Sequence, residues 1–184
     1  MGIPSLYYPA QMFTRPILFR AAVISLLFFA ALGVSAGSKA KEPAPRFNAR
    51  TMDGEKFTNE SIKGKVVLLE FWTTWCVYCF EEAGLVDQIN REFHDKGLIV
   101  LAVNVAESKK TVKKYLDAHP RSSRIVLTDD TNLAAMYEAT VYPIYVVIDR
   151  NGNIAGTQRG AGGEEALRDL LADGGMGSKE ESEK

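Results

Sequence analysis

The feature that most constrains the fold is an apolar segment that leads into the two cysteines of the chain. Residues 66–72 read Val-Val-Leu-Leu-Glu-Phe-Trp, and this β-branched and large aliphatic run predicts a strand buried on both faces. A short polar turn follows, and Cys76 and Cys79 come directly after it, separated by two residues. We therefore expect the cysteines where a strand ends and a helix begins.

The expected helix start gives the two cysteines different chemical roles. The first turn of a helix carries unpaired N–H groups and the positive end of the helix dipole, and both favour a thiolate. Cys76 is therefore predicted to be the acidic, exposed thiol, and Cys79 the core-facing partner that closes an intramolecular disulfide. Because a thiolate is the species that attacks disulfides, the pair is expected to cycle between dithiol and disulfide.

Residues 71–79, Phe-Trp-Thr-Thr-Trp-Cys-Val-Tyr-Cys, resemble the active-site signature of the thioredoxin superfamily. The wider context, residues 47–173, is similar to its exported branch, the TlpA-like, ResA-like and cytochrome-c-maturation proteins. The resemblance implies a thioredoxin fold, no cofactor, and reduction of disulfides in client proteins such as apocytochrome c or copper-site proteins. It also implies that a membrane thiol-disulfide electron donor regenerates the dithiol.

The first 36 residues have the pattern of an export signal. Arg15 and Arg20 precede an apolar stretch, residues 21–34, which ends in a small-x-small cleavage pattern at residues 34–36. The stretch is short for a spanning helix, which needs about 20 residues, so cleavage and export to the periplasm are expected. An uncleaved membrane anchor is the alternative, and only in that case is the membrane a partner.

The rest of the chain is interpreted as a linker, one domain and a tail. Residues 37–46 contain charged residues and two prolines and are predicted to link the signal to a thioredoxin-like domain at residues 47–173. Asp53-Gly54 is a hairpin turn signal, so an N-terminal β-ribbon is expected ahead of the core sheet. The polar, glycine-bearing residues 174–184 are predicted to be a disordered tail.

After the cysteines, helical and strand patterns alternate. The first helix is expected to end at the stop signal Lys96-Gly97. Strands are expected next at residues 98–105, 125–127, 144–148 and 153–158, with a hairpin turn at residues 151–152 between the last two. Helices are expected between the earlier strands, at residues 107–118 and 129–137, and after the last strand, at residues 164–172. This order predicts an α/β fold with a mixed central β-sheet flanked by helices, and it also matches the thioredoxin fold.

Glu70 is the one charged residue in the central strand. An isolated buried carboxylate raises its pKa and stays protonated. Near Cys79, such a group is expected to accept or donate the proton when the disulfide is cleaved or formed. The position resembles the buried acid of thioredoxins, where many exported relatives have asparagine. The alternative is a glutamate at the strand end whose carboxylate reaches solvent.

Glu82 lies three residues after Cys79, so the two side chains share a face of the expected helix. The exported branch is similar in having a glutamate at this offset, which implies that Glu82 tunes the cysteines. The alternative is that Glu81 and Glu82 only bring favourable negative charge to a first helical turn. Gly84 departs from the family pattern, which has a proline there.

Tyr142-Pro143 precedes the last buried strand. A proline at a strand start is compatible with a rigid turn and no further role. The resemblance implies instead a cis-proline beside the cysteines, next to backbone that pairs with an extended client segment. Trp75 is next to Cys76 and is predicted to be exposed contact surface. Substrate binding is therefore assigned to Trp75, Tyr142 and Pro143.

Cysteine count and charge limit the other functions. Paired thiolates also select zinc or copper, but no second Cys or His pair is present, and His94 and His119 are far apart in the sequence. No metal site is assigned, and a protein that handles Cu(I) with the same dithiol is the alternative function. With 22 Lys+Arg against 23 Asp+Glu, nothing favours nucleic acid as a partner.

Overall fold

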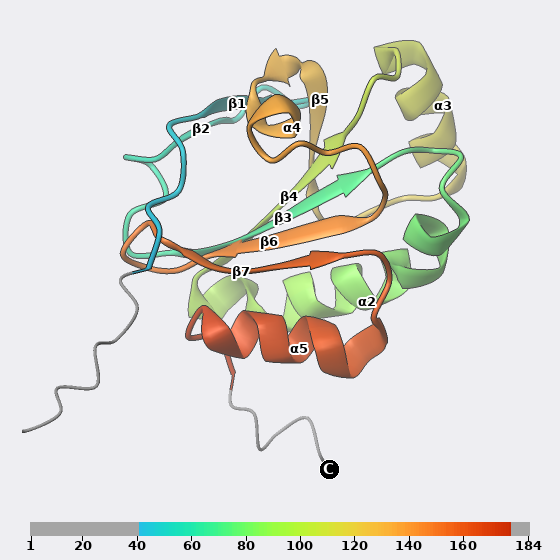
Figure 1. Cartoon of the computed structure of the whole chain (residues 1–184). Helices are drawn as coiled ribbons and strands as arrows, with labels where there is room; N and C mark the ends of the chain where they lie inside the picture. Colours follow the sequence, from blue (N-terminus) through green and yellow to red (C-terminus); the bar gives the residue numbers. More distant parts are fainter. Residues whose placement is uncertain (1–40, 178–184) are drawn as a thin grey trace, which may run out of the picture. The chain divides into compact units, whose positions relative to one another are not determined.

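A computed structural model describes residues 41–177, and the strands in this range form one mixed sheet (Figure 1). The strand order across the sheet is β2 (Lys56–Thr58), β1 (Asn48–Thr51), β5 (Arg124–Thr131), β4 (Leu98–Asn104), β3 (Val66–Trp72), β6 (Ile144–Ile148) and β7 (Ile154–Arg159). At the centre, β3 (Val66–Trp72) runs parallel to β4 (Leu98–Asn104) and antiparallel to β6 (Ile144–Ile148). The predicted α/β class with a mixed central sheet is confirmed.

The outer elements extend this centre on both sides. β5 (Arg124–Thr131) runs parallel to β4, and β7 (Ile154–Arg159) forms an antiparallel hairpin with β6. The helices are α2 (Val77–Phe93), α3 (Lys109–Ala118), the short α4 (Leu133–Met136) and α5 (Gly163–Asp173), with a 3-10 turn, η1 (His94–Lys96), after α2. None of the helices in residues 41–177 has the length and apolar character that crossing a bilayer requires.

The central strand is buried on both faces, as its sequence predicts. Every residue of β3 is buried. Val67, Leu69 and Phe71 join one hydrophobic cluster, while Val66 and Leu68 face the opposite side, in a cluster with residues of α2 and α5. Figure 1 shows α2 and α5 together on that side of the sheet. Because both faces are packed, β3 is held firmly and places the cysteines at the end of the strand.

The predicted N-terminal ribbon is formed by β1 (Asn48–Thr51) and β2 (Lys56–Thr58). Gly54 in the turn between them has a φ of +98°, a conformation that favours glycine. β1 also pairs antiparallel with β5, with Ala49 opposite Thr131. The ribbon therefore belongs to the main sheet and is not a separate hairpin.

β5 is longer than the sequence indicates, and the helix after it is shorter. The apolar pattern predicts a strand at residues 125–127 and helix caps at residues 129–132. Instead, β5 continues to Thr131, and α4 begins only at Leu133. Pairing with β1 supplies backbone hydrogen bonds to this polar stretch and keeps it extended, which the local pattern does not reveal.

The packed domain extends beyond both predicted limits. In the predicted linker, Lys41 Nζ lies 3.1 Å from Asp149 Oδ2, and the Ala44 N–H donates to the Gly152 carbonyl. Met176, assigned to the predicted disordered tail, is only 3% exposed and packs with α2 and α5. The predicted export signal and residues 178–184 lie outside the described residues.

Candidate active site

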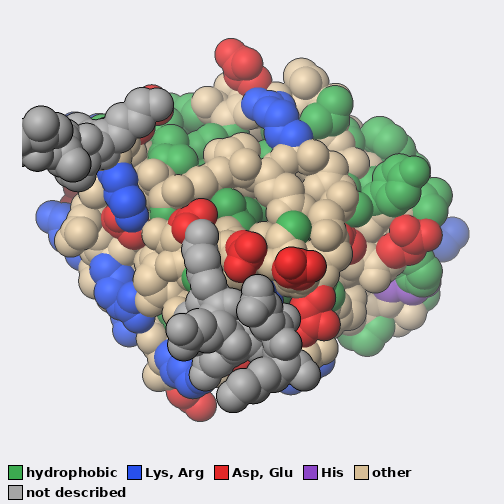
Figure 2. All heavy atoms as spheres, turned by 60° about the horizontal axis from the view of Figure 1, so that its bottom comes forward, with side chains coloured by type: hydrophobic (Ala, Val, Ile, Leu, Met, Phe, Trp, Pro, Cys, Tyr) green, Lys and Arg blue, Asp and Glu red, His purple; other side chains and the backbone are tan. Residues whose placement is uncertain are grey.

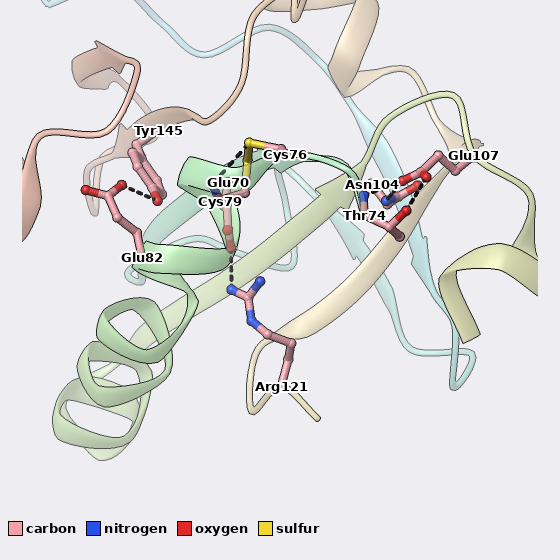
Figure 3. Close-up of a disulfide and its surroundings, with 9 residues drawn as sticks. All are labelled: Glu70, Thr74, Cys76, Cys79, Glu82, Asn104, Glu107, Arg121 and Tyr145. Atoms are coloured by element: carbon pink, nitrogen blue, oxygen red, sulfur yellow. Dashed lines mark hydrogen bonds and ion pairs between the residues drawn. A yellow bond between two sulfur atoms is a disulfide. The ribbon is translucent and has the colours of Figure 1, made fainter. Parts of the chain in front are cut away.

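The two cysteines form a disulfide at the N-terminus of α2, where the sequence predicts it (Figure 3). Cys76 is the N-cap residue of this helix, and its Sγ accepts a hydrogen bond from the backbone N–H of Cys79 at 3.1 Å. In the reduced protein the same N–H and the helix dipole favour the thiolate of Cys76 over its thiol. This geometry favours Cys76 as the attacking sulfur with Cys79 as its partner, and the two roles stay predictions.

Cys76 is less accessible than its position in the sequence indicates. The prediction is an exposed thiol, but Cys76 is 6% exposed and Cys79 is 2% exposed. The disulfide bond holds the Cys76 sulfur against the first helical turn, within an apolar cluster that includes Trp72. The expectation of an exposed Cys76 is wrong for the disulfide form, so a partner must reach a recessed sulfur.

An exposed apolar rim lies next to the recessed disulfide. Trp75 is 68% exposed, and the other large hydrophobic residues of the rim, all about half exposed or more, are Val77, Tyr78, Phe80 and Val141. Figure 2 shows hydrophobic side chains gathered at the right-hand edge of the molecule, the side on which α2 begins in Figure 1. A gathering of exposed apolar side chains marks a surface for contact with a partner.

Tyr142 and Pro143 lie beside this rim. The peptide bond between them is cis, as the resemblance implies. The Tyr142 ring packs edge-on against Trp75, with 5.7 Å between ring centroids, and also against the apolar cluster that contains both cysteines. The Tyr142 hydroxyl donates to the Ala139 carbonyl at 3.0 Å, which orients the ring. The structure thus brings the three predicted substrate-binding residues together beside the disulfide.

Glu107 and Asn104 hold the turn before Cys76, although no pattern in the sequence marks either of them as a site residue. Glu107 Oε2 accepts from the Thr74 N–H and from Asn104 Nδ2, both at 2.7 Å, and Glu107 Oε1 accepts from the Thr74 hydroxyl (Figure 3). These bonds tie the turn to the end of β4. The available signal is position, because Asn104 ends a strand that pairs with β3 opposite Trp72.

Glu70 is buried under α2 and is paired. It has no exposed surface, so the alternative of a carboxylate that reaches solvent is wrong. Arg121 Nη2 donates to Glu70 Oε2 at 2.7 Å, so the carboxylate is not isolated. Burial raises the pKa of Glu70 above its ordinary value, and the charge of Arg121 opposes that rise. The predicted direction of the pKa is confirmed, but the predicted isolation is not.

Glu82 is buried on α2, as is Cys79, but its carboxylate makes a different set of contacts. Oε2 accepts from the Tyr145 hydroxyl at 2.9 Å, and Oε1 accepts from the N–H groups of Gly162 and Gly163 at 3.0 and 2.7 Å. α5 has no N-cap side chain of its own, so Glu82 caps it. Figure 3 shows this pair of side chains to one side of the disulfide. A tuning role for Glu82 stays a prediction.

Comparisons with known proteins agree with this geometry. Residues 39–172 match the Redoxin family. The thioredoxin-like protein YneN of Bacillus subtilis is 35% identical over 121 residues, which cover 64% of this chain and 70% of YneN. The thiol-disulfide oxidoreductase ResA of Bacillus subtilis is 28% identical over 128 residues, which cover 70% of this chain and 72% of ResA.

A solved structure supports the same relationship. A thiol:disulfide interchange protein of the thioredoxin family from Chlorobium tepidum matches with a TM-score of 0.62 and 25% identity. The match covers 72% of this chain and 94% of that protein, and it confirms the predicted thioredoxin fold. The chain therefore belongs to the Redoxin family, as a ResA-like thiol-disulfide oxidoreductase of the thioredoxin superfamily.

Proposed function

We propose that this protein is an exported reductase that reduces disulfides of client proteins by dithiol-disulfide exchange at Cys76 and Cys79. The observation that carries the proposal is the Cys79 N–H, which donates to Cys76 Sγ at the start of α2, beside the apolar rim. A thiolate stabilised in this way attacks disulfides, and the rim gives an extended client segment an apolar surface to contact.

The proposed cycle transfers two electrons from the protein to the client. The Cys76 thiolate attacks one sulfur of the client disulfide, and the other client sulfur leaves as a thiolate. Cys79 then loses its proton and attacks Cys76 in the resulting mixed disulfide. The second client sulfur leaves, and Cys76 is bonded to Cys79. The client gains two thiols, and the protein is left as the disulfide form that the structure shows.

The clients, the electron donor and the location are part of the same proposal. Suitable clients carry exposed disulfides, as apocytochrome c or copper-site proteins do in an oxidising compartment. The export signal predicted in residues 1–36 supports a periplasmic location, soluble or anchored at the N-terminus. A reductase in that compartment needs a membrane thiol-disulfide donor to return Cys76 and Cys79 to the dithiol.

Trapping experiments test the proposed cycle. Cys79→Ser removes the sulfur that resolves the mixed disulfide, so covalent adducts with a disulfide-bearing apocytochrome should accumulate. Cys76→Ser, the matched control, lacks the attacking sulfur and should form none. Non-reducing electrophoresis with mass spectrometry measures both. Equal trapping by the two variants, or by neither, would contradict the assignment of roles.

The alternative function, handling of Cu(I) by the same dithiol, makes a different prediction. Paired thiolates bind Cu(I) without turnover of disulfides. Tight one-to-one binding of Cu(I) by the reduced protein, together with no reduction of insulin disulfides, would favour the alternative. Catalytic turnover of insulin disulfides, lost in Cys76→Ser, would favour the reductase.

A further inference from the structure

A buried cluster of charged side chains lies beneath the cysteine motif. The side chain of Arg121 is only 3% exposed, and its guanidinium contacts Glu70 at 2.7 Å and approaches Asp87, with 3.6 Å from Nε to Oδ1. It also lies over the ring of Trp72, with Cζ 5.6 Å from the centroid. A buried guanidinium costs free energy unless it is paired. The fold therefore holds Arg121 at this place by specific contacts.

The loop that carries Arg121 is held by the buried face of α2. Asp87 Oδ1 accepts from the backbone N–H and the hydroxyl of Ser122, at 2.9 and 3.1 Å. Asn90 Nδ2 donates to the Ser122 carbonyl at 2.9 Å. Two side chains one turn apart on α2 thus clamp the residue that follows Arg121. The clamp fixes the loop, and the loop directs the guanidinium inward to Glu70.

The side chain of Glu70 points to the face of the sheet against which Cys79 of α2 packs. Glu70 on β3 is directly opposite Ala102 on β4, so their side chains point to the same face. Ala102 belongs to the apolar cluster that contains Cys76 and Cys79. In Figure 3 the Glu70 side chain lies between the disulfide and Arg121. One carboxylate oxygen contacts Arg121, and among residues 41–177 the other, Oε1, has no hydrogen-bond partner.

We propose that Arg121 is a positioning residue for the thiol-disulfide chemistry, which fixes the Glu70 carboxylate beneath Cys79 and keeps it able to accept the Cys79 proton. The proposal rests on the function proposed above and adds a residue to its second step. Glu70 Oε1 is the buried acceptor that the pair leaves unused. Without Arg121, the same carboxylate would be buried alone and would hold a proton of its own.

Titratable side chains face Glu70 from the helices and strands that pack around it. α2 contributes Asp87 and Glu82, whose charges raise the pKa of Glu70 in addition to its burial. Tyr145 of β6 and Tyr115 of α3 also interact with its charge, and burial raises the pKa of both phenols. Arg121 is the one cation in this set, so it alone opposes the rise in the pKa of Glu70.

The step that this arrangement serves is balanced in atoms and electrons. The Cys79 thiol gives its proton to the Glu70 carboxylate, and the resulting thiolate attacks Cys76 in the mixed disulfide. The bond between Cys76 and the client breaks, and the client sulfur leaves with the electron pair. Glu70 then returns its proton to solvent or to the departing client thiolate.

The test follows the two thiols separately with a small disulfide probe. In stopped flow, reduced protein and excess dithiobis(nitrobenzoate) release thionitrobenzoate in two phases, the first from attack by Cys76 and the second from attack by Cys79. The variants are Arg121→Met, Arg121→Lys, Glu70→Gln and the double variant Glu70→Gln/Arg121→Met. Arg124→Met is the matched control, because Arg124 pairs with Glu55 on the ribbon. The rates are measured across the pH range.

The proposal predicts that the pH dependence of the rate changes in the second phase and not in the first. In Arg121→Met its pH midpoint should rise by about one pH unit or more, because an adjacent cation lowers the pKa of a carboxyl by that amount. In Arg121→Lys and in Arg124→Met the pH midpoint of the second phase should stay near that of wild type. The double variant should have the profile of Glu70→Gln, since Arg121 acts through Glu70.

Two results would overturn the proposal. One is a folded Arg121→Met protein, with a native circular dichroism spectrum, whose second-phase profile equals that of wild type. If Arg121→Met does not fold, the double variant decides, and a profile different from that of Glu70→Gln contradicts the proposal. Because the probe is a small molecule, this result is independent of the client trapping that tests the proposed function.

Discussion

The two buried glutamates beside the cysteines differ in how their oxygens are used. Glu82 accepts three hydrogen bonds, from Tyr145 and from two backbone N–H groups, so both oxygens are occupied by neutral donors. Glu70 accepts one, from Arg121, and its Oε1 has no hydrogen-bond partner among residues 41–177. A proton binds more readily to a carboxylate oxygen that accepts no hydrogen bond than to one that donors already hold. The comparison therefore favours Glu70 for chemistry and Glu82 for packing.

The largest expected effect comes from breaking the Glu70–Arg121 pair on one side. Arg121→Met leaves a buried carboxylate without its cation and should lower the free energy of unfolding by about 3–5 kcal/mol. Glu70→Gln/Arg121→Met removes both charges and should recover most of the loss. Chemical denaturation at neutral pH measures both. A single variant as stable as wild type would mean that Glu70 does not depend on Arg121.

The next largest effect is expected from a change at Glu82. In Glu82→Gln the amide nitrogen cannot accept, so a buried donor on Tyr145 or at the start of α5 loses its partner. The free energy of unfolding should fall by about 1–3 kcal/mol. The pH profile of the Cys79 reaction should keep its titration, with a midpoint at or below that of wild type, because the charge of Glu82 raises the pKa of Glu70. Loss of the titration, or a midpoint above that of wild type, would assign the proton transfer to Glu82 and reverse the comparison.

The pH dependence of stability tests Glu70 in the disulfide form. Burial raises its pKa above the ordinary value of 4.5, so the folded state binds this proton more tightly than the unfolded state. The resulting stabilisation is complete below pH 4.5 and is lost as the pH rises through the folded pKa. The free energy of unfolding of wild type should therefore fall relative to that of Glu70→Gln across that window. The raised pKa would be contradicted if the free energy of unfolding of wild type, relative to that of Glu70→Gln, stayed constant or rose with pH across this window.

The smallest expected effect comes from one hydrogen bond. Tyr145→Phe removes the hydroxyl that donates to Glu82 and keeps the packing of the ring. The free energy of unfolding should fall by about 0.5–1.5 kcal/mol. In the Glu82→Gln background, Tyr145→Phe should lower the free energy of unfolding by less, because the acceptor of the Tyr145 hydroxyl is already altered. Tyr142→Phe, whose hydroxyl donates to a backbone carbonyl, is the control and should cost the same in both backgrounds.

Features set by neighbouring residues could be predicted from the sequence. The apolar composition of residues 66–72 indicates a strand buried on both faces, and the position of Cys76 and Cys79 after it indicates a helix start. Both are observed. The burial of Glu70 follows from its apolar neighbours in the same strand. In each case the determining contacts lie within a few residues or within one strand.

Features set by distant partners could not be predicted. Arg121 is 51 residues from Glu70, in a polar loop with no local signal of burial, and Tyr145 is 63 residues from Glu82. The extension of β5 depends on β1, which comes much earlier in the chain. The position of Cys76 at a helix start predicts an exposed thiol, but Cys76 packs in an apolar cluster with Val112 and Leu127, which come much later in the chain.

The most direct test of the account is a redox titration of the Cys76–Cys79 pair. The protein is equilibrated with dithiothreitol or glutathione buffers, and the fraction of disulfide is measured by alkylation and mass spectrometry. A reductase predicts reversible two-electron exchange at a potential near that of thioredoxin, about −270 mV, or below it. A potential near that of DsbA, about −120 mV, or a failure to exchange reversibly, would contradict it.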